Sequence, residues 1–256
     1  MYLTVLGSSA NQTANREGVA LLFENESSTL LIDSGPGIIA SLQRANRNAS
    51  DINNLLLTHT HGDHILGFAY FVWNRNFERL GKEPAKDLNV YGNAVSINLA
   101  RIMLEKCYPD AKFSFTVNYF TLTSEDELKI DNFSVVVVDA IHQVSTLSCL
   151  IREDDKLVCY SSDSLPNEKL LSLSKNAKLV IHEGMFTIKS EYLSRKVMHS
   201  TAKDAGKFAQ MTDCKQLLMV HIAPELFGKE FELLNEASIE YKGNISIPRD
   251  GSVYYV

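Results

Sequence analysis

The chain has 256 residues, of which 45% are hydrophobic and 22% are charged. This balance is typical of a globular protein with a sizeable core and excludes a largely disordered chain. The formal net charge of −6 argues against extended contact with nucleic acid, because proteins that grip a long polyanion carry excess lysine and arginine. A local basic patch would still be compatible with this acidic total.

The sequence predicts a cytoplasmic protein without a membrane segment. The opening MYLTVLGSS has no basic region before its apolar residues, so it is typical of a first strand rather than a signal peptide. No apolar run approaches the roughly 20 residues of a membrane span. The four cysteines are widely separated and include no C-x-x-C pair, so we expect buried free thiols rather than a structural zinc site.

The first half of the chain alternates β-prone runs with helical segments. The NESS segment supplies turn residues between the second and third runs, and SGPG ends the third run before a helix. A later apolar strand leads into a loop rich in histidine. We expect strands at 2–6, 19–24, 28–33, 54–58 and 88–92, with helices at about 37–46, between 65 and 80, and after 92 to about 106.

The second half repeats this style with β-branched and aromatic strands. Its expected strands are 113–118, 127–130, 133–139, 147–153, 156–161, 178–182 and 216–221, and its expected helices are 166–174 and 201–211. Strand runs followed by helices predict two packed sheets covered by helices on both outer faces, which is a four-layer αββα sandwich of the α/β class. We find no linker, so residues 1–256 are expected to form a single domain.

The loop after the strand at 54–58 carries the pattern H-x-H-x-D-H. His59, His61, Asp63 and His64 fall within six consecutive positions. Residues two apart on an extended loop project to the same side, so His59 and His61 can share one ion while the other two turn toward a second. The loop therefore predicts two neighbouring metal ions, which need further ligands from elsewhere in the chain.

Three more candidate ligands follow apolar strands. His142 comes after VVVVDAI, Asp163 after KLVCYSS and His221 after QLLMV. A buried strand holds the residue beyond its end rigidly at the sheet edge, as a preorganised metal site requires. A carboxylate such as Asp163 can bridge two cations. A single histidine after a strand is usually a surface or core residue, but the neighbouring cluster favours ligation here.

The order of these ligands resembles the metallo-β-lactamase superfamily. The resemblance rests on the H-x-H-x-D-H loop, on LLIDSGPG before it, and on the single His, Asp and His that follow. It also implies that Asp33 supports the metal loop through hydrogen bonds, although an ordinary turn aspartate is the alternative. It implies one ion held by His59, His61, His142 and Asp163, and another held by Asp63, His64, Asp163 and His221.

Two later segments, VIHEGMF and MHSTAKDAGKFA, are similar to paired segments of ribonuclease Z and related phosphodiesterases. The likeness implies that Glu183 orients His199 toward a scissile phosphate, so that Asp63, Glu183 and His199 are the expected catalytic residues. Phosphodiester hydrolysis needs a proton for the leaving alkoxide, and a neighbouring carboxylate raises the pKa of an imidazole that supplies it. The alternative for His199 is a place at the entry of the following helix. The role of His182 stays open.

The sequence departs from ribonuclease Z at one place. That family usually has a long arm, rich in glycine and proline, between the third metal motif and the bridging aspartate. The arm grips the tRNA body. Here only two predicted strands and a turn separate His142 from Asp163. The missing arm and the acidic charge favour a small nucleotide or cyclic phosphodiester over RNA, as in armless phosphoribosyl cyclic phosphodiesterases. Those enzymes have an additional cysteine-based zinc site, for which this chain offers no equivalent.

Cleavage of tRNA precursors at the 3′ side is therefore the alternative function. Lactone or β-lactam hydrolysis gives Glu183 and His199 no evident task, and a binding module without turnover is disfavoured by the complete ligand set. Imidazole and carboxylate ligands suit several ions, and we expect two divalent ions, zinc or manganese. By analogy with ribonuclease Z relatives we expect a homodimer. The aromatic stretch FAYFVW at 68–73 is a candidate for its interface, although such stretches are more often core.

Overall fold

Two seven-stranded sheets packed face to face form the centre of the protein, in a computed structural model that describes residues 1–256. The first sheet has the strand order β14-β1-β2-β3-β4-β5-β6 and the second has the order β13-β12-β11-β10-β9-β8-β7. The strands of the first sheet are β1 (Tyr2–Gly7), β2 (Ala20–Glu24), β3 (Thr29–Ile32), β4 (Asn54–Leu57), β5 (Leu88–Gly92), β6 (Val117–Thr121) and β14 (Ser252–Tyr255). Those of the second are β7 (Glu127–Ile130), β8 (Phe133–Asp139), β9 (Leu147–Glu153), β10 (Lys156–Tyr160), β11 (Leu179–Glu183), β12 (Gln216–Val220) and β13 (Asn244–Ser246).

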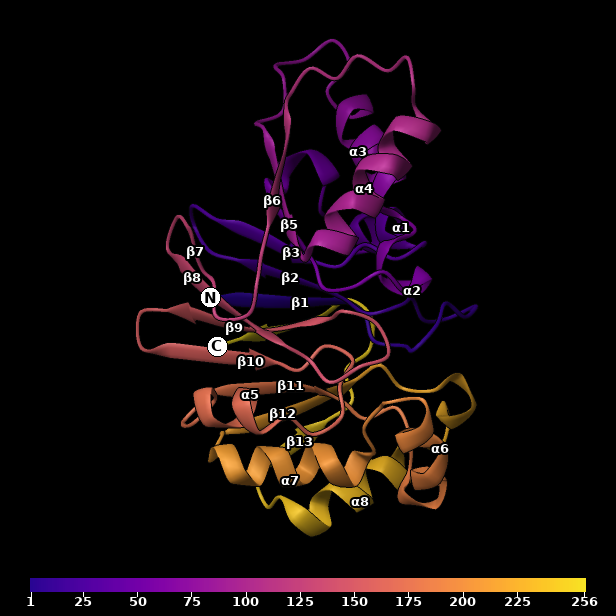
Figure 1. Ribbon diagram of the computed structural model, residues 1–256, viewed down its shortest axis with the longest axis vertical. Coiled ribbons are helices and arrows are strands. Elements are labelled where there is room, and N and C mark those ends of the chain that lie inside the picture. The colour runs from indigo at the N-terminus through magenta and orange to yellow at the C-terminus, as the bar shows by residue number, and fades with distance from the viewer.

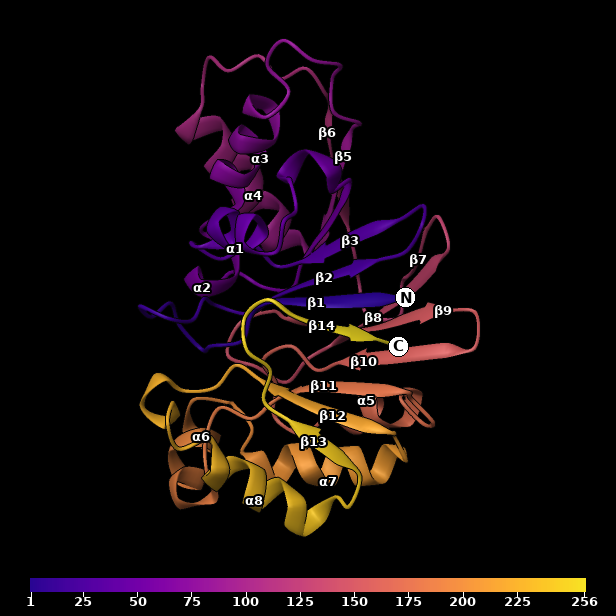
Figure 2. The ribbon, with the colours of Figure 1, turned by 180° about the vertical axis from the view of Figure 1, so that it is seen from behind.

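Helices cover the outer face of each sheet, as Figures 1 and 2 show. Three of them, α1, α3 and α4, lie against the first sheet, and α5, α7 and α8 lie against the second. This arrangement confirms the expected αββα sandwich. The helices are α1 (Ile38–Arg44), α2 (Gly62–Ile65), α3 (Phe68–Phe77), α4 (Ala94–Cys107), α5 (Glu168–Leu173), α6 (Glu191–Lys196), α7 (Ala202–Thr212) and α8 (Glu230–Glu240), with single 3-10 turns at Ala49–Asp51, Ile188–Ser190 and Pro224–Leu226.

The central strands are apolar on both faces because each sheet lies between the other sheet and a layer of helices. In β4 all four residues are buried. Leu56 belongs to the core between the two sheets, whereas Leu55 and Leu57 belong to the core between the first sheet and its helices. Each of these leucines removes enough apolar surface from water to contribute about 1.5–3 kcal/mol. The unbroken apolar run that precedes the histidine loop follows from this double burial.

The parallel strands bring their carboxyl ends to one edge of the sandwich. In the first sheet β3, β4, β5 and β6 run parallel, and in the second sheet β10, β11, β12 and β13 do so. The loops after β4, β10 and β12 therefore open at the same end of the molecule. Figure 1 shows α2 and α6 at this end, while the two chain termini lie near the opposite end.

The expected strand at 113–118 is wrong in position, since β6 begins only at Val117, which pairs with Leu88. The aromatic residues before it pack as a loop: Phe115 is buried beside α3 and α4, and Phe113 lies against the same core. Asn76 holds this loop by accepting from the backbone of Ser114. Most other expected elements appear with ends shifted by up to three residues. The helices α2, α6 and α8 and the strands β13 and β14 were not expected from the sequence.

The cysteines form no disulfide, and three of the four are buried as expected. Cys107, at the end of α4, is exposed and departs from that expectation. No helix has the length and the apolar character needed to cross a bilayer.

The start of α7 is fixed by a capping box between Thr201 and Asp204. Each side chain accepts a hydrogen bond from the other residue's backbone N–H, and the Asp204 carboxylate also accepts from Arg195 at 2.8 Å. Burial raises the pKa of Asp204, but the bonds from Arg195 and Thr201 outweigh it and hold that pKa below its ordinary value. The native state therefore stabilises the ionised carboxylate.

Asp204→Ala is expected to lower the free energy of unfolding by about 1–2 kcal/mol at pH 7. Because the native pKa is lowered, this contribution is complete above the ordinary aspartate pKa of about 4 and is lost as the pH falls through the native value. Urea unfolding of both proteins between pH 7 and pH 3 measures the difference. Asp155→Ala, at an exposed site, is the matched control. A difference that persists undiminished in acid would contradict the assignment.

Candidate metal centre

The histidine loop is held at the end of β4 by close backbone packing. His59 and His61 lie in the turn after the strand, and Asp63 and His64 lie in α2. A Cβ atom on Gly35 would come within 2.0 Å of the Asp63 carbonyl oxygen. Only glycine permits this approach of the SGPG segment to α2. Gly35 thus sets the position of the short helix α2, which carries the candidate ligands Asp63 and His64.

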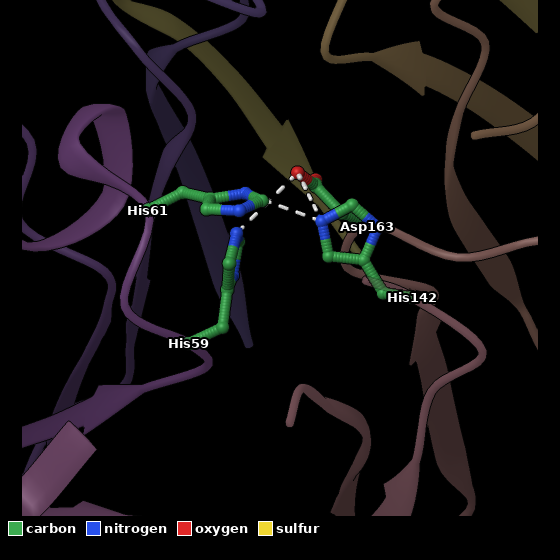
Figure 3. A group of neighbouring side chains, drawn as sticks. All are labelled: His59, His61, His142 and Asp163. Atoms are coloured by element: carbon green, nitrogen blue, oxygen red, sulfur yellow. Dashed lines mark hydrogen bonds and ion pairs between the residues drawn. The ribbon is translucent and has the colours of Figure 1, made fainter. Parts of the chain in front are cut away.

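The first group of side chains consists of His59, His61, His142 and Asp163. One potential ligand atom from each lies within 4.8 Å of all the others. His61 Nδ1 is 3.2 Å from His142 Nε2, and His59 Nε2 is 3.5 Å from Asp163 Oδ2. Figure 3 shows His59 and His61 pointing toward His142 and Asp163, which follow strands of the second sheet.

The second group consists of Asp63, His64 and His221, again within 4.8 Å of one another. Asp63 Oδ2 is 3.4 Å from both His64 Nε2 and His221 Nε2. Asp163 Oδ2 is 3.5 Å from His64 Nε2 and 3.2 Å from His221 Nε2. One carboxylate oxygen of Asp163 therefore faces both groups, which is the position that a bridging ligand takes.

Several buried ligand atoms have no hydrogen-bond partner in the protein. They include Nε2 of His59, Nε2 of His64 and Oδ1 of Asp163. Buried polar atoms are almost always satisfied, and unsatisfied imidazole nitrogens that converge on carboxylates fit a divalent cation. The groups suit divalent metal binding by their chemistry as well as by their spacing.

The protonation states mostly agree with this fit. Burial lowers the pKa of His59 and that of His142, so both imidazoles are neutral, as ligation requires. Burial opposes ionisation of Asp163, but His221 and His64 outweigh it and hold its pKa well below the ordinary value. His64 differs: against burial, Asp163 and Asp33 raise its pKa. A cation bound at Nε2 would replace that proton.

Asp33 supports the loop through three hydrogen bonds, which favours the supporting role over an ordinary turn aspartate. Its carboxylate accepts from the Thr58 backbone N–H and hydroxyl, both at 2.8 Å, and lies 2.7 Å from His64 Nδ1. Because a carboxylate only accepts, His64 carries its proton on Nδ1 and turns Nε2 toward the cluster. Thr58, which the sequence did not single out, lies 3.0 Å from His59 Nδ1 through its hydroxyl.

Glu183 and His199 lie together beside the two groups. His199 Nδ1 is 3.0 Å from one Glu183 carboxylate oxygen, and the backbone N–H groups of Ser164 and Ser200 donate to the same carboxylate. Burial lowers the pKa of His199, but Glu183 outweighs it and raises that pKa above the ordinary value. The His199 ring stacks on His221 with centroids 5.0 Å apart, so its free edge lies at the cluster. Thr201, not His199, caps α7.

His182 lies apart from this centre. Its ring packs against Phe208 of α7, with centroids 4.9 Å apart, and its Nδ1 is 2.6 Å from the Glu183 carbonyl oxygen. Alternation along β11 turns Glu183 toward the cluster and His182 toward the helix layer. The structure thus brings together every residue expected at the site and leaves His182 in the packing of α7.

Comparison with known proteins agrees with this geometry. The family described as "Anti-Pycsar protein Apyc1" matches residues 1–222. The chain belongs to the Apyc1 family. This Apyc1-family chain is also 24% identical over 300 aligned positions to a ribonuclease Z of Prochlorococcus marinus strain MIT 9301, with 93% of the chain and 94% of the relative covered.

Solved structures show the same fold. The metallo-β-lactamase fold protein YhfI of Bacillus subtilis superposes with a TM-score of 0.85 at 23% identity, covering 99% of the Apyc1-family chain and 98% of its own. A diphosphatase of the PhnP family gives a TM-score of 0.74 at 17% identity, with 100% and 97% covered. These structures confirm the predicted metallo-β-lactamase fold. The ribonuclease Z relative confirms the predicted ribonuclease Z-like kinship and indicates a metal-dependent hydrolase.

Asp33→Asn is expected to weaken zinc binding about 10–100-fold, the usual effect of losing a group that orients a metal ligand. The asparagine amide can donate to His64 Nδ1, which moves the histidine proton to Nε2 and blocks the nitrogen that faces the cluster. Competition with a chromogenic chelator measures the affinity. Thr58→Ser, which keeps the hydroxyl, is the control. Unchanged zinc affinity in Asp33→Asn would contradict the supporting role.

Proposed function

We propose that this protein is a binuclear metal-dependent phosphodiesterase that hydrolyses a small nucleotide or cyclic phosphodiester. The observation that carries the proposal is the buried Glu183–His199 pair beside a cluster of imidazoles and carboxylates. Two ions account for the cluster through the seven other side chains, and His199, although it also lies within 4.8 Å of Asp163 and His221, is bonded to Glu183. A group that delivers a proton to a leaving alkoxide is what phosphodiester hydrolysis adds to such a centre.

The proposed ligands divide between two divalent ions, zinc or manganese. His59, His61 and His142 would hold the first, Asp63, His64 and His221 would hold the second, and Asp163 would be shared by both. When bound, the ions would activate a water molecule and neutralise charge on the phosphate. Asp63 would contribute to catalysis by holding the second ion, since its Oδ2 lies 3.4 Å from Nε2 of both His64 and His221.

His199 supplies the proton in this proposal. Glu183 accepts a hydrogen bond from Nδ1 of His199, so the proton that the imidazole gives to the leaving group is the one on Nε2. The carboxylate stabilises the charged imidazole and fixes the ring plane, so that the acid is ready without rearrangement. Glu183 itself is held by backbone donors on either side of the site, from Ser164 and Ser200. The pair is thus oriented by two separate segments of the backbone.

A small substrate is favoured by the segment between His142 and Asp163. It consists of β9, a turn and β10, and both strands are paired within the second sheet. No arm extends from it to grip the body of a tRNA. The net charge of −6 offers little general attraction for RNA. The likeness to a PhnP-family diphosphatase is in line with a small phosphate ester.

Endonucleolytic cleavage of tRNA precursors is the second candidate, because curated relatives of the chain carry the name ribonuclease Z. A gel assay on a 3′-extended precursor tRNA separates the two. Efficient cleavage of that precursor, with no hydrolysis of cyclic nucleotides, would reverse the order of the two functions.

Protein loaded with manganese or zinc is expected to hydrolyse bis-(p-nitrophenyl) phosphate. His199→Ala is expected to lower kcat about 10²–10⁴-fold while the bound metal stays unchanged, because the variant loses only the proton donor. Absorbance at the nitrophenolate band gives the rate, and elemental analysis gives the metal content. Tyr192→Ala, an exposed position in the preceding helix, is the control. Absence of turnover with any divalent ion would refute the proposal.

We also propose that the protein is a homodimer joined through the exposed side of α3. In the aromatic stretch at 68–73, four residues are buried core and Tyr70 is exposed. Leu66, Tyr70 and Phe77 follow one another at helical spacing and are each more than half exposed. An apolar stripe of this length on a monomer surface is typical of a contact between proteins.

Tyr70→Glu is expected to convert the dimer to a monomer, because a carboxylate at the centre of an apolar interface loses its hydration without gaining a partner. Light scattering after size exclusion measures the mass. Phe231→Glu, at an equally exposed apolar position on α8, should leave the mass unchanged. A wild-type protein that elutes as a monomer at all concentrations would remove this part of the proposal.

A further inference from the structure

His142 is held in place without hydrogen bonds from its own backbone. It lies in the irregular segment between β8 and β9, and its own backbone N–H and carbonyl make no hydrogen bond within the chain. Its side chain is nevertheless completely buried. His64, by comparison, is fixed by its helix and by Asp33. The orientation of the His142 ring therefore depends on what its side chain touches.

Outside the candidate ligands, the His142 ring packs edge-on against the His199 ring, with centroids 4.8 Å apart, and forms its hydrogen bond with the backbone of Met198. His142 Nδ1 lies 3.0 Å from the Met198 carbonyl oxygen. A carbonyl only accepts, so Nδ1 carries the proton and Nε2 keeps its lone pair. Nε2 is the nitrogen that lies 3.2 Å from His61 Nδ1 and faces the first group of ligands. The Met198 carbonyl thus fixes the form of His142 that can bind a cation.

Met198 presents this carbonyl from a strained backbone conformation. Its φ is +55°, in the left-handed region that residues other than glycine rarely adopt. The residue follows α6, and its N–H donates to the Arg195 carbonyl at 3.2 Å, which ends the helix. Glycine or asparagine is usual at such a position. A strained residue whose carbonyl orients a candidate ligand indicates a functional constraint.

The two residues after Met198 are the proposed proton donor, His199, and Ser200, which binds the carboxylate that orients it. His199 is bonded to Glu183, and its backbone N–H donates to the Ser194 carbonyl at 2.9 Å. The Ser200 N–H donates to the Glu183 carboxylate at 3.1 Å. Of these three consecutive residues, Met198 orients His142, His199 is the proposed proton donor, and Ser200 binds the Glu183 carboxylate. A shift of this segment would move all three together.

We propose that Met198 is a positioning residue that joins the first metal site to the proton donor. The inference deepens the proposed function and rests on it. The left-handed conformation at Met198 sets the carbonyl that orients His142 and, through the same peptide, the backbone of His199. Replacing the side chain matters only through this conformation, because the hydrogen bond comes from the backbone.

The test compares residues that tolerate the left-handed region with residues that do not. Met198→Val places a β-branched side chain there and is expected to weaken zinc binding at the first site about 10-fold, with a fall in kcat and little change in KM. Met198→Asn tolerates the conformation and should keep zinc affinity within about twofold of wild type. Chelator competition measures affinity, and hydrolysis of bis-(p-nitrophenyl) phosphate gives kcat and KM.

The outcomes separate this inference from the proposed function. If wild-type protein takes up no zinc, the proposed function fails. If wild type and Met198→Val bind zinc equally, only the role of Met198 fails, and it fails also if Met198→Asn loses as much affinity as Met198→Val. Should the valine variant not fold, proton NMR of the zinc-loaded wild type decides: a slowly exchanging His142 Nδ1 proton supports the inference, and rapid exchange overturns it.

Discussion

The structure depends on one electrostatic constraint, the burial of the Asp163 carboxylate among four imidazoles. Its Oδ2 atom lies between 3.2 and 4.0 Å from Nε2 of His59, His64, His142 and His221. Charged and polar groups removed from water are costly unless they are paired, and hydrogen bonds within the chain leave several of these atoms unsatisfied. The apolar strands hold the groups at one edge, and divalent cations would compensate the burial. The fold thus holds together charged and polar groups that would each be hydrated separately in the unfolded chain.

Much of the centre could be predicted because its signals are local. A continuous apolar run such as that of β4 marks a strand buried on both faces, and a histidine or aspartate directly beyond its end falls at the sheet edge. This pattern predicts His59, His142 and Asp163 as candidate ligands. In the second sheet, β8 and β10 both run antiparallel to β9, so the residues that follow them lie at the same edge, where they meet the loop after β4. The four layers followed from the same alternation of strands and helices.

Other features could not be predicted, because they depend on contacts between distant segments. The Met198 carbonyl belongs to the backbone, so the residue type at this position gives no indication of its role. The Thr58 hydroxyl supports the site by donating to Asp33, and this contact depends on the tertiary structure. Strand β6 begins later than expected because Phe115 is taken by the core beside α3 and α4 rather than by the sheet. In each case tertiary packing outweighed a local preference for one structure.

The distribution of the ligands along the chain has a consequence for biosynthesis. The candidate ligands of the first sheet all lie before residue 65, whereas His142, Asp163 and His221 belong to the second sheet. Each cluster contains members from both sheets, so a nascent chain can complete the first group only after Asp163 has left the ribosome and the second only after His221 has done so. Metal uptake at these groups would therefore follow the docking of the two sheets. Once bound, an ion would cross-link the two halves of the sandwich, so that a fragment made of either half would lack this source of stability.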